Sequence, residues 1–564
     1  MTTGLSFLSV HRYWLALALI CLVSLGAGIH DVPPETHEMF VTGTVREMHA
    51  RHDYLVPYFN GELRLTKPPL AYWFTAVVAK MTDDLHDVQP WHARVPSVVA
   101  GMVMVLLTGV LGLRLFDPAV GLLAAALLGG SWSLFHYAHS ARPDMLYAAC
   151  CTAQILALVL AWQWRARPRR QRWASWAAWL SIGLAILSKG PQLPAMILLA
   201  FVLWFAINQE SWHLVLRTLR PWSGICLAAV ISLPWWWWLH QQPGTASTLA
   251  HSELSGSLLV PGWHHLFSGF YLLSALQFML PWVIPMAVLP WYVWQARYDA
   301  PRRRMLNLLG LLVVIPMLLL PLGLQLRDHY ILPVMGPLSV LLAVATLQWS
   351  AHASRRLLFA LLVLHGLLGV AAMLYLFYLD WHRHAMLDPY PLLALLGMLG
   401  LVVFISWQRT QTPLKNWLSI SLACMMSLAA AAQSPSFWSQ DRYAEKYLGE
   451  AVARRVPLRA HLLAVNGNEE ALSFYTRRQV LKLHSLSDLT SLQFPQPELP
   501  IYLAWYGKAP ALWPANYEAE IVWQGQMKGE VPLTLIRLSR IQDPHDLARL
   551  SGRDQEPRSS GAVN

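Results

Sequence analysis

The sequence predicts an all-α polytopic membrane domain followed by a small C-terminal α/β domain. Hydrophobic residues make up 55% of the 564 residues, charged residues only 13%, and the mean hydropathy is +0.39. A soluble domain has about a quarter charged residues. Apolar runs of about 20 residues, the length that crosses a hydrocarbon core, recur as far as residue 433 and then stop. We therefore expect a transmembrane domain at 1–433.

The apolar runs predict about thirteen transmembrane helices. The first run lacks a cleavage-site pattern, so we keep it as a helix rather than a signal peptide. The segment 31–92 is expected to be an external first loop with interfacial helices. The spans are expected at 13–30, 93–115, 118–138, 145–164, 173–188, 191–208, 221–240, 270–296, 305–324, 330–349, 357–380, 390–407 and 416–433.

Clusters of arginine and lysine predict the orientation, because cytoplasmic loops hold an excess of them close to the membrane. With these spans, all the clusters fall on the side of the N-terminus, which is therefore expected in the cytoplasm. They lie at 165–172, 297–304, 355–356 and 409–415. The clusters are short and lack interleaved aromatic residues, so the net charge of +11 predicts contact with anionic membrane lipids and no nucleic-acid partner.

The C-terminal part changes in pattern after residue 433. The segments AHLLAVN, PIYLAWYG, EAEIVWQ and VPLTLIRL are short and apolar or alternating, which is typical of strands, and EEALSFYTRRQ reads as a helix between them. We expect an external α/β domain at 434–542. The charged segment 543–564 is expected to be a flexible tail.

Ionisable residues gather at the external ends of the predicted spans. They lie in the 31–73 loop, the 139–144 junction, Lys189, the 241–269 loop and residues 327–330. Such groups at membrane depth are costly and are functional by default. The middles of the spans are apolar, which argues against a pump or a channel. The pattern favours an interfacial site for a substrate with an apolar tail and a polar head.

The sequence predicts no metal site. All five cysteines fall inside predicted spans, where a cysteine usually serves as a small apolar residue. A zinc site would require distant loops to meet, and histidines this scattered are usually surface residues. The residues concerned are His37, Glu253, His264 and His265.

Six runs, in order, resemble the integral-membrane glycosyltransferases that use polyprenyl-phosphate sugars. They are HEMFVTGTVREM, HDYLVPYFNGELRLTKPPLAYW, ARVPS, SARPDMLYA, SKGP and LRDHYILPVMGP. The pattern is similar to the 4-amino-4-deoxy-L-arabinose lipid A transferases and to the dolichyl-phosphate-mannose-protein mannosyltransferase-like proteins. The resemblance implies a GT-C fold and a bacterial inner-membrane location, with the site and the C-terminal domain in the periplasm.

The first loop departs from this family at a site position. The family's acidic pair, Asp-Glu followed by Arg-Tyr, falls on His37-Glu38 followed by Phe40-Val41. Glu38 keeps a carboxylate, so the resemblance implies that Glu38 is a catalytic residue. Because the aspartate is missing, the secondary candidates are His37, Glu35 and Asp31.

Two further motifs match without a gap. The family's Lys-Pro-Pro falls on Lys67-Pro68-Pro69, and its second acidic position falls on Asp144. Sugar transfer needs a base or acceptor for the nucleophile and cations on the departing phosphate. We expect Glu38 and Asp144 to fill the first role. The candidate phosphate or substrate ligands are Lys67, Arg142, Lys189, Arg327 and His329, with Arg94 as a secondary candidate.

Structural roles compete with these assignments. Glu38 would also suit a solvated interfacial helix, Asp144 the first turn of a helix, and Lys67 a position where the side chain snorkels to the interface. Arg94, Arg327 and His329 would also suit the ends of spans. The tryptophans at 235–238 are typical of an interfacial belt.

The function expected from these residues and the resemblance is an inverting glycosyltransferase. The donor is a sugar on undecaprenyl phosphate, and the favoured acceptor is lipid A or another envelope glycolipid. No cofactor is required, although related lipid-linked transferases leave a divalent cation open. The alternatives are a protein O-glycosyltransferase with the same donor, a flippase or transporter for the lipid-linked sugar, and a non-catalytic member of the fold.

Overall fold

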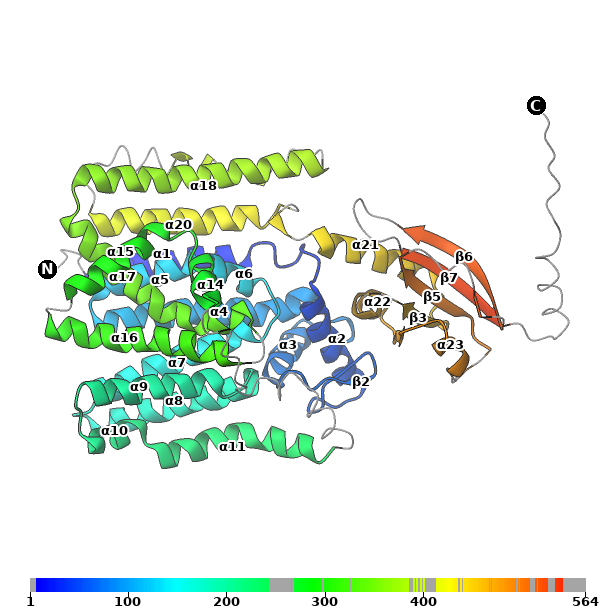
Figure 1. The fold of residues 1–564 in the computed structure, drawn as a ribbon, viewed down its shortest axis with the longest axis horizontal. Helices are drawn as coiled ribbons and strands as arrows, with labels where there is room; N and C mark the ends of the chain where they lie inside the picture. The colour runs from blue at the N-terminus through cyan, green and yellow to red at the C-terminus, as the bar shows by residue number, and fades with distance from the viewer. Residues whose placement is uncertain are drawn as a thin grey trace. The chain divides into compact units, whose positions relative to one another are not determined.

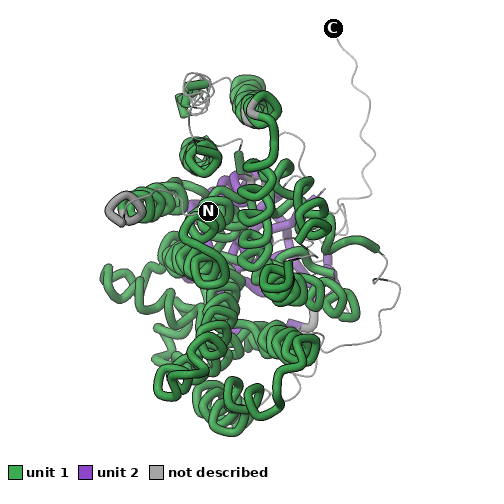
Figure 2. The backbone as a smooth tube through the Cα atoms, turned by 90° about the vertical axis from the view of Figure 1, so that its left-hand side faces the viewer, with its two compact units in different colours: residues 1–59, 63–438 green, residues 60–62, 439–564 purple. Residues whose placement is uncertain are grey.

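The computed structural model divides into two compact units, Met1–Phe59 with Leu63–Trp438, and Asn60–Glu62 with Ser439–Asn564 (Figure 2). It describes residues 7–242, 265, 268–296, 299–323, 326–384, 389–390, 392–393, 396–397, 399–400, 412–434, 437–438, 440–465, 467, 469–492, 494, 496, 498–507, 513–514, 516–525 and 533–540.

The first unit is almost entirely helical (Figure 1). Its α-helices are α1 Phe7–Gly26, α2 Thr36–Ala50, α3 Leu70–Met81, α4 Pro90–Leu115, α5 Pro118–Gly129, α6 Trp132–Ala138, α7 Asp144–Gln163, α8 Pro168–Ser188, α9 Gln192–Ile207, α10 Trp212–Leu219, α11 Pro221–His240, α14 Phe270–Phe278, α15 Val283–Ala296, α16 Ala300–Leu319, α17 Met335–His352, α18 Arg355–His384 and α20 Pro413–Ala431. Short elements join them: β1 Tyr58–Phe59, β2 Glu62–Leu63, and the 3₁₀ turns η1 Leu85–Asp87, η2 Leu320–Leu322 and η3 Asp328–Val334.

Among the described helices, seven are long and apolar enough to cross a membrane, or eight if a bent pair counts as one span. The bent pair is α5 and α6, which meet at 56°. The span expected at 118–138 is therefore broken, because Gly129 and Gly130 end α5 and Ser131 caps α6. The run expected at 270–296 is likewise two helices, α14 and α15. The span expected at 390–407 lies largely outside the described residues.

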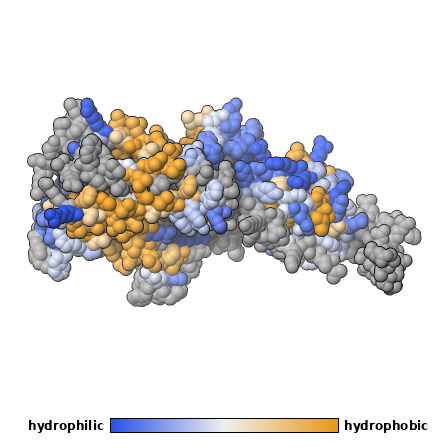
Figure 3. All heavy atoms as spheres, turned by 90° about the horizontal axis from the view of Figure 1, so that it is seen from above, coloured by the Kyte–Doolittle hydropathy of each residue, from blue (hydrophilic) through white to orange (hydrophobic). Residues whose placement is uncertain are grey.

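The helices α4, α5, α7 and α17 form the buried centre of this unit. Small residues allow α4 and α5 to approach closely, since a Cβ on Gly121 would lie 2.5 Å from the backbone oxygen of Gly109. All residues of α5 from Ala119 onward are buried. The outer surface of the unit is instead hydrophobic over a broad area (Figure 3), with exposed side chains such as Val230 and Leu273. Such a surface suits contact with lipid.

The second unit contains a five-stranded mixed sheet in the order β4-β3-β5-β7-β6. β4, β3 and β5 pair in parallel, and β5, β7 and β6 pair antiparallel. The elements are α21 Gln440–Arg455, β3 His461–Val465, α22 Glu469–Thr476, β4 Leu481–Leu483, α23 Asp488–Ser491, β5 Ile501–Tyr506, β6 Tyr517–Gly525 and β7 Leu533–Arg540.

The strands of this sheet alternate their side chains between two apolar cores. On β3, Leu462 and Ala464 join one core with α21 and α22, whereas Leu463 and Val465 join the other. The segments expected to be strands form β3, β5, β6 and β7, and the helix expected between them is α22. The tail expected at 543–564 lies outside the described residues.

Candidate active site

A cavity of about 270 Å³ in the helical unit brings most of the predicted site residues together. Its walls come from α2, the segment before α3, the loop before α7 and the segment around η3. The charged and polar residues that line it are His37, Arg64, Thr66, Lys67, Tyr72, Arg142, Asp144, Arg327 and His329. Residues far apart in the chain, from 37 to 329, therefore share one site.

The cavity wall carries more positive than negative charge. Four cationic side chains line it, Arg64, Lys67, Arg142 and Arg327, each partly buried. Among the lining residues that the structure describes, Asp144 alone carries a carboxylate. Guanidinium and ammonium groups that converge in this way suit a phosphate, which accepts several charge-assisted hydrogen bonds at once.

Two buried polar atoms of this wall have no partner in the described part of the chain. They are Arg64 Nε and Thr66 Oγ1. Leaving a buried donor unsatisfied costs about 1–3 kcal/mol, and more for a charged group. A ligand with acceptor oxygens at this place would remove that cost.

Arg64 is the site residue that the sequence analysis missed. Its guanidinium carbon lies 3.5 Å from the ring centroid of Phe40, the residue that stands where the resemblance expects an arginine. The cation missing from α2 is thus replaced from another segment. The available signal was the spacing in GELRLTKPP, where Arg64 precedes Lys67 by three residues.

Asp144 is the first residue of α7 and is buried. Its carboxylate accepts a hydrogen bond from Lys189, which caps the end of α8, and the favourable helix dipole acts on the same group. The Ser188 hydroxyl donates to the Pro143 carbonyl over 3.0 Å and ties the same two helix ends together. Lys189 does not line the cavity, so it holds Asp144 rather than facing a ligand.

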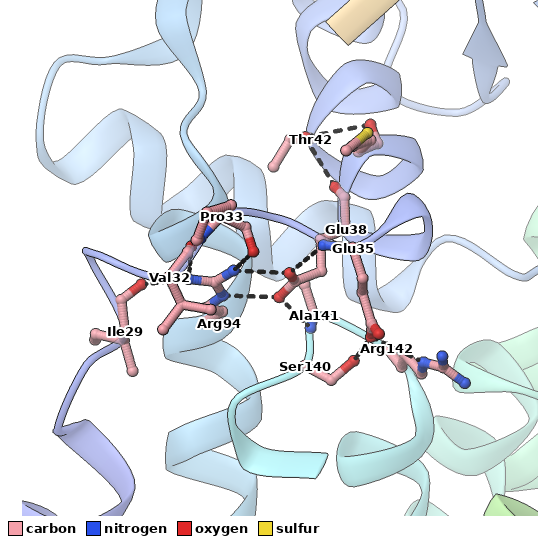
Figure 4. Close-up of polar contacts among 11 residues, drawn as sticks. Ile29, Val32, Pro33, Glu35, Glu38, Thr42, Arg94, Ser140, Ala141 and Arg142 are labelled. Carbon is pink, nitrogen blue, oxygen red and sulfur yellow. Dashed lines mark hydrogen bonds and ion pairs between the residues drawn. The ribbon is translucent and has the colours of Figure 1, made fainter. Parts of the chain in front are cut away.

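Glu38 lies behind the cavity wall, in a fully buried ion pair (Figure 4). Arg94 donates to it through two bonds of 2.7 Å, one to each carboxylate oxygen. The same oxygens accept from the backbone N–H of Ala141 over 3.2 Å and of Glu35 over 2.9 Å. Arg94 also donates to the carbonyls of Ile29 and Val32. Glu38 is therefore not among the lining residues of the cavity, and both of its carboxylate oxygens accept hydrogen bonds from the protein.

Glu35 orients one cation of the cavity. It caps α2 and accepts from the Ser140 hydroxyl over 2.5 Å and from Arg142 Nε over 3.2 Å (Figure 4). Asp31 is exposed in the preceding turn and does not line the cavity. Of the secondary acids, Glu35 therefore reaches the site, through Arg142.

His37 lies exposed at the rim of the cavity. Desolvation by the neighbouring protein and then the charge of Arg142 lower its pKa, so the ring is neutral at pH 7. Where the family carries a carboxylate, this chain therefore carries no charge. The net charge of the cavity is therefore more positive than it would be with an aspartate at position 37.

The structure describes two of the four residues of the alternative zinc site. Glu253 and His264 lie outside the described residues, whereas His265 and His37 lie within them. Within the described part of the chain, no group of three or more His, Cys, Asp or Glu side chains is arranged to hold a metal ion.

Comparisons with known proteins identify similar membrane glycosyltransferases. Residues 66–238 match the family described as dolichyl-phosphate-mannose-protein mannosyltransferase. An undecaprenyl phosphate-α-4-amino-4-deoxy-L-arabinose arabinosyl transferase of Pseudomonas aeruginosa is 26% identical over 97% of this chain and 96% of its own length. A second, from Pseudomonas fluorescens, is 26% identical over 84% of this chain and 86% of its own length.

A solved structure shares the fold. The ArnT protein of Cupriavidus metallidurans, crystallised with undecaprenyl phosphate, superposes with a TM-score of 0.71 at 17% identity, over 93% of this chain and 97% of that chain. The resemblance inferred from the sequence is thus confirmed, and so is the expected enzyme class, since these relatives are named as glycosyltransferases.

Proposed function

We propose that this chain transfers a sugar from undecaprenyl phosphate to lipid A or another envelope glycolipid, with inversion at the anomeric carbon. The cavity with four converging cations and an unpaired buried Arg64 Nε is the observation that carries the proposal. The relatives named above support the donor type, because their names specify undecaprenyl phosphate carrying an aminoarabinose.

The cations act on the leaving group. As the acceptor oxygen attacks the anomeric carbon, the bond from that carbon to the phosphate oxygen breaks and the phosphate gains negative charge. Arg64, Lys67, Arg142 and Arg327 are placed to stabilise that charge, which lowers the barrier when the contacts tighten in the transition state. The lipid carrier leaves as the phosphate monoester.

Asp144 accepts the proton of the attacking hydroxyl in this proposal. Lys189 donates to one of its oxygens, Oδ1, and no described residue donates to Oδ2. That second oxygen is assigned to the acceptor. Lys189 keeps the carboxylate ionised and fixed, and Glu38 with Arg94 holds Ala141, and so the adjoining Arg142, in position.

The topology completes the proposal. We propose about thirteen spans, with the N-terminus in the cytoplasm and with the cavity and the C-terminal sheet domain on the periplasmic side of a bacterial inner membrane. The positions of the arginine clusters support this orientation.

A protein acceptor is the second candidate, favoured by the match of residues 66–238 to a protein mannosyltransferase family. Mass spectrometry of lipid A, other glycolipids and envelope proteins from cells with and without the gene distinguishes the two. Loss of a sugar from lipid A supports the first and loss from a protein the second. Movement of the lipid-linked sugar across vesicles without a new glycosidic bond would support a transporter and overturn both.

Site variants make that comparison specific. Asp144→Asn and Arg64→Ala are expected to abolish or strongly reduce the modification, whereas Lys80→Ala, an exposed cation on α3 outside the cavity, leaves it intact. Full modification by the Asp144→Asn and Arg64→Ala variants together would contradict the site assignment.

A further inference from the structure

A second cavity, of about 850 Å³, lies at the other end of α7. It is lined by the C-terminal ends of α4, α7 and α9 and by the first turns of α16. α7 has Asp144 at its N-terminal end in the first cavity and Trp162 near its C-terminal end in the second. At 1.5 Å per residue, about 27 Å separates them, so the two cavities are distinct sites.

This cavity is basic. Three successive arginines of α16, Arg302, Arg303 and Arg304, line it, and none of its described lining residues is acidic. Two of the three are held by nearby carboxylates, Arg302 by Asp299 and Arg304 by Glu210. For Arg303, which is exposed, the structure records no ion pair with a described residue. Among the described residues, no ion pair therefore compensates the charge of Arg303.

Two buried donors in the wall lack acceptors. Trp162 is 9% exposed, and its Nε1 has no hydrogen-bond partner within the described chain; the same holds for Arg304 Nε. The Arg304 guanidinium carbon lies 5.0 Å from the Trp162 ring centroid and 5.3 Å from that of Trp204. The cation is thus held against two indoles while its Nε is left unpaired, which is costly without a ligand that accepts hydrogen bonds.

Beside the polar side chains of Gln163, Asn208 and Asn307, the wall has an apolar part, and the cavity opens toward the surface of the helices. Leu115, Phe116, Ile207 and Met305 line it, and Ile207 is 57% exposed. A soluble anion makes no use of these side chains, whereas a lipid places its phosphate on the arginines and its acyl chains along apolar helix surface. Basic pockets between transmembrane helices are known to bind acidic phospholipid head groups.

We propose that this second cavity binds the phosphodiester of an anionic phospholipid. Arg303 and the Trp162 indole N–H contact the phosphate oxygens, and the acyl chains leave past Ile207. The site is separate from the sugar-transfer cavity, so its ligand is neither donor nor acceptor, and the proposal stands or falls independently of the proposed function.

Native mass spectrometry of the purified full chain tests it. The probes are dioleoyl phosphatidylglycerol, dioleoyl phosphatidylcholine and soluble sn-glycerol-1-phosphate. We expect retention of phosphatidylglycerol in preference to phosphatidylcholine, and about tenfold weaker retention in Arg303→Ala, the loss expected for one charge-assisted bond. Trp162→Phe, which keeps a ring but removes the N–H, is expected to weaken retention as well.

Arg170→Ala is the matched control, since Arg170 is an exposed arginine at the N-terminal end of α8 that does not line the cavity. It should retain phosphatidylglycerol like the parent chain. The proposal is overturned if Arg303→Ala and Trp162→Phe both bind like the parent, if Arg170→Ala loses as much, or if phosphatidylcholine binds equally. Equal retention of glycerol phosphate would identify a soluble phosphate site and reject the lipid.

Discussion

Arg94 and Glu38 form a bidentate ion pair in which the two side chains are only 1% and 0% exposed. The pair connects α4 to α2 and, through the Glu38 bond to the Ala141 N–H, to the loop that carries Arg142 and Asp144. A buried pair of this kind contributes little net stability compared with an apolar pair, but removing one partner leaves the other charge buried. The pair therefore matters mainly because it fixes the positions of α2, α4 and the loop at Ala141 relative to one another.

Arg94→Ala is expected to lower the free energy of unfolding by about 3–5 kcal/mol, because it leaves the Glu38 carboxylate buried and uncompensated. Denaturant unfolding in detergent measures the change. The double variant Glu38→Met with Arg94→Met should recover much of the stability while activity stays low, since the loop at Ala141 loses its anchor. Full activity in the double variant would contradict the positioning role.

The cationic cavity predicts how the donor binds. Arg64→Ala and Lys67→Ala are each expected to weaken binding of undecaprenyl phosphate about tenfold, because each removes a charge-assisted contact. Arg64→Lys should recover only part, since an ammonium lacks the planar donors of a guanidinium. Titration of the lipid against intrinsic fluorescence or by native mass spectrometry gives the affinities. Unchanged affinity in Arg64→Ala would remove this residue from the site.

Asp144→Asn separates chemistry from binding. With the proton acceptor gone, kcat should fall about 10²–10⁴-fold, whereas affinity for the lipid phosphate should be kept or increase, because a negative charge leaves the cavity. Steady-state kinetics with donor in excess, paired with the binding titration, reports both quantities. A variant that turns over at the parental rate would show that another group accepts the proton.

His37 predicts an acid-dependent loss of stability. Its pKa is lower in the folded chain than in the unfolded chain, so protonation is easier after unfolding, and the stability contributed by the neutral ring is lost as the pH falls below about 6.5. His37→Asn should flatten the fall in thermal midpoint between pH 7 and pH 4.5 relative to the parent. Identical pH profiles for the two chains would contradict the shift.

Removal of divalent cations is expected to leave turnover unchanged. The four cationic side chains already compensate the phosphate charge and would repel a divalent cation in the same cavity. Turnover before and after exhaustive treatment with EDTA measures this. A loss that Mg²⁺ or Mn²⁺ restores would assign a metal to the mechanism.

The sequence predicted which residues line the cavity better than it predicted which side chains contact one another. Lys67, Arg142, Asp144, Arg327 and His329 were expected from motifs, and all of them line one cavity. The pairing of Glu38 with Arg94 was not expected, because the residues lie 56 positions apart and spacing says nothing about which ends of two helices meet. Composition places an ionisable group near the interface, but only tertiary packing decides whether it faces a ligand or another side chain.

The helices of the first unit were also predicted only in part. Hydropathy located the long apolar helices of the first unit that the structure describes, because each apolar run must satisfy its own backbone. It missed the bend between α5 and α6, since Gly129-Gly130-Ser131 is short and the runs on both sides remain apolar. A window of about 19 residues averages such a break away.

The enclosure of α5 also bears on biosynthesis. This helix has 12 residues and is about 18 Å long, which is too short to cross a hydrocarbon core by itself. Almost all of its residues are buried against other helices rather than exposed to lipid. One of its walls is α17, which begins at Met335 and is synthesised some 200 residues later. α5 leads through α6 into the loop of Arg142 and Asp144. A ribosome that stops before α17 therefore releases a chain that carries every described lining residue of the cavity, yet lacks one of the helices that pack against α5.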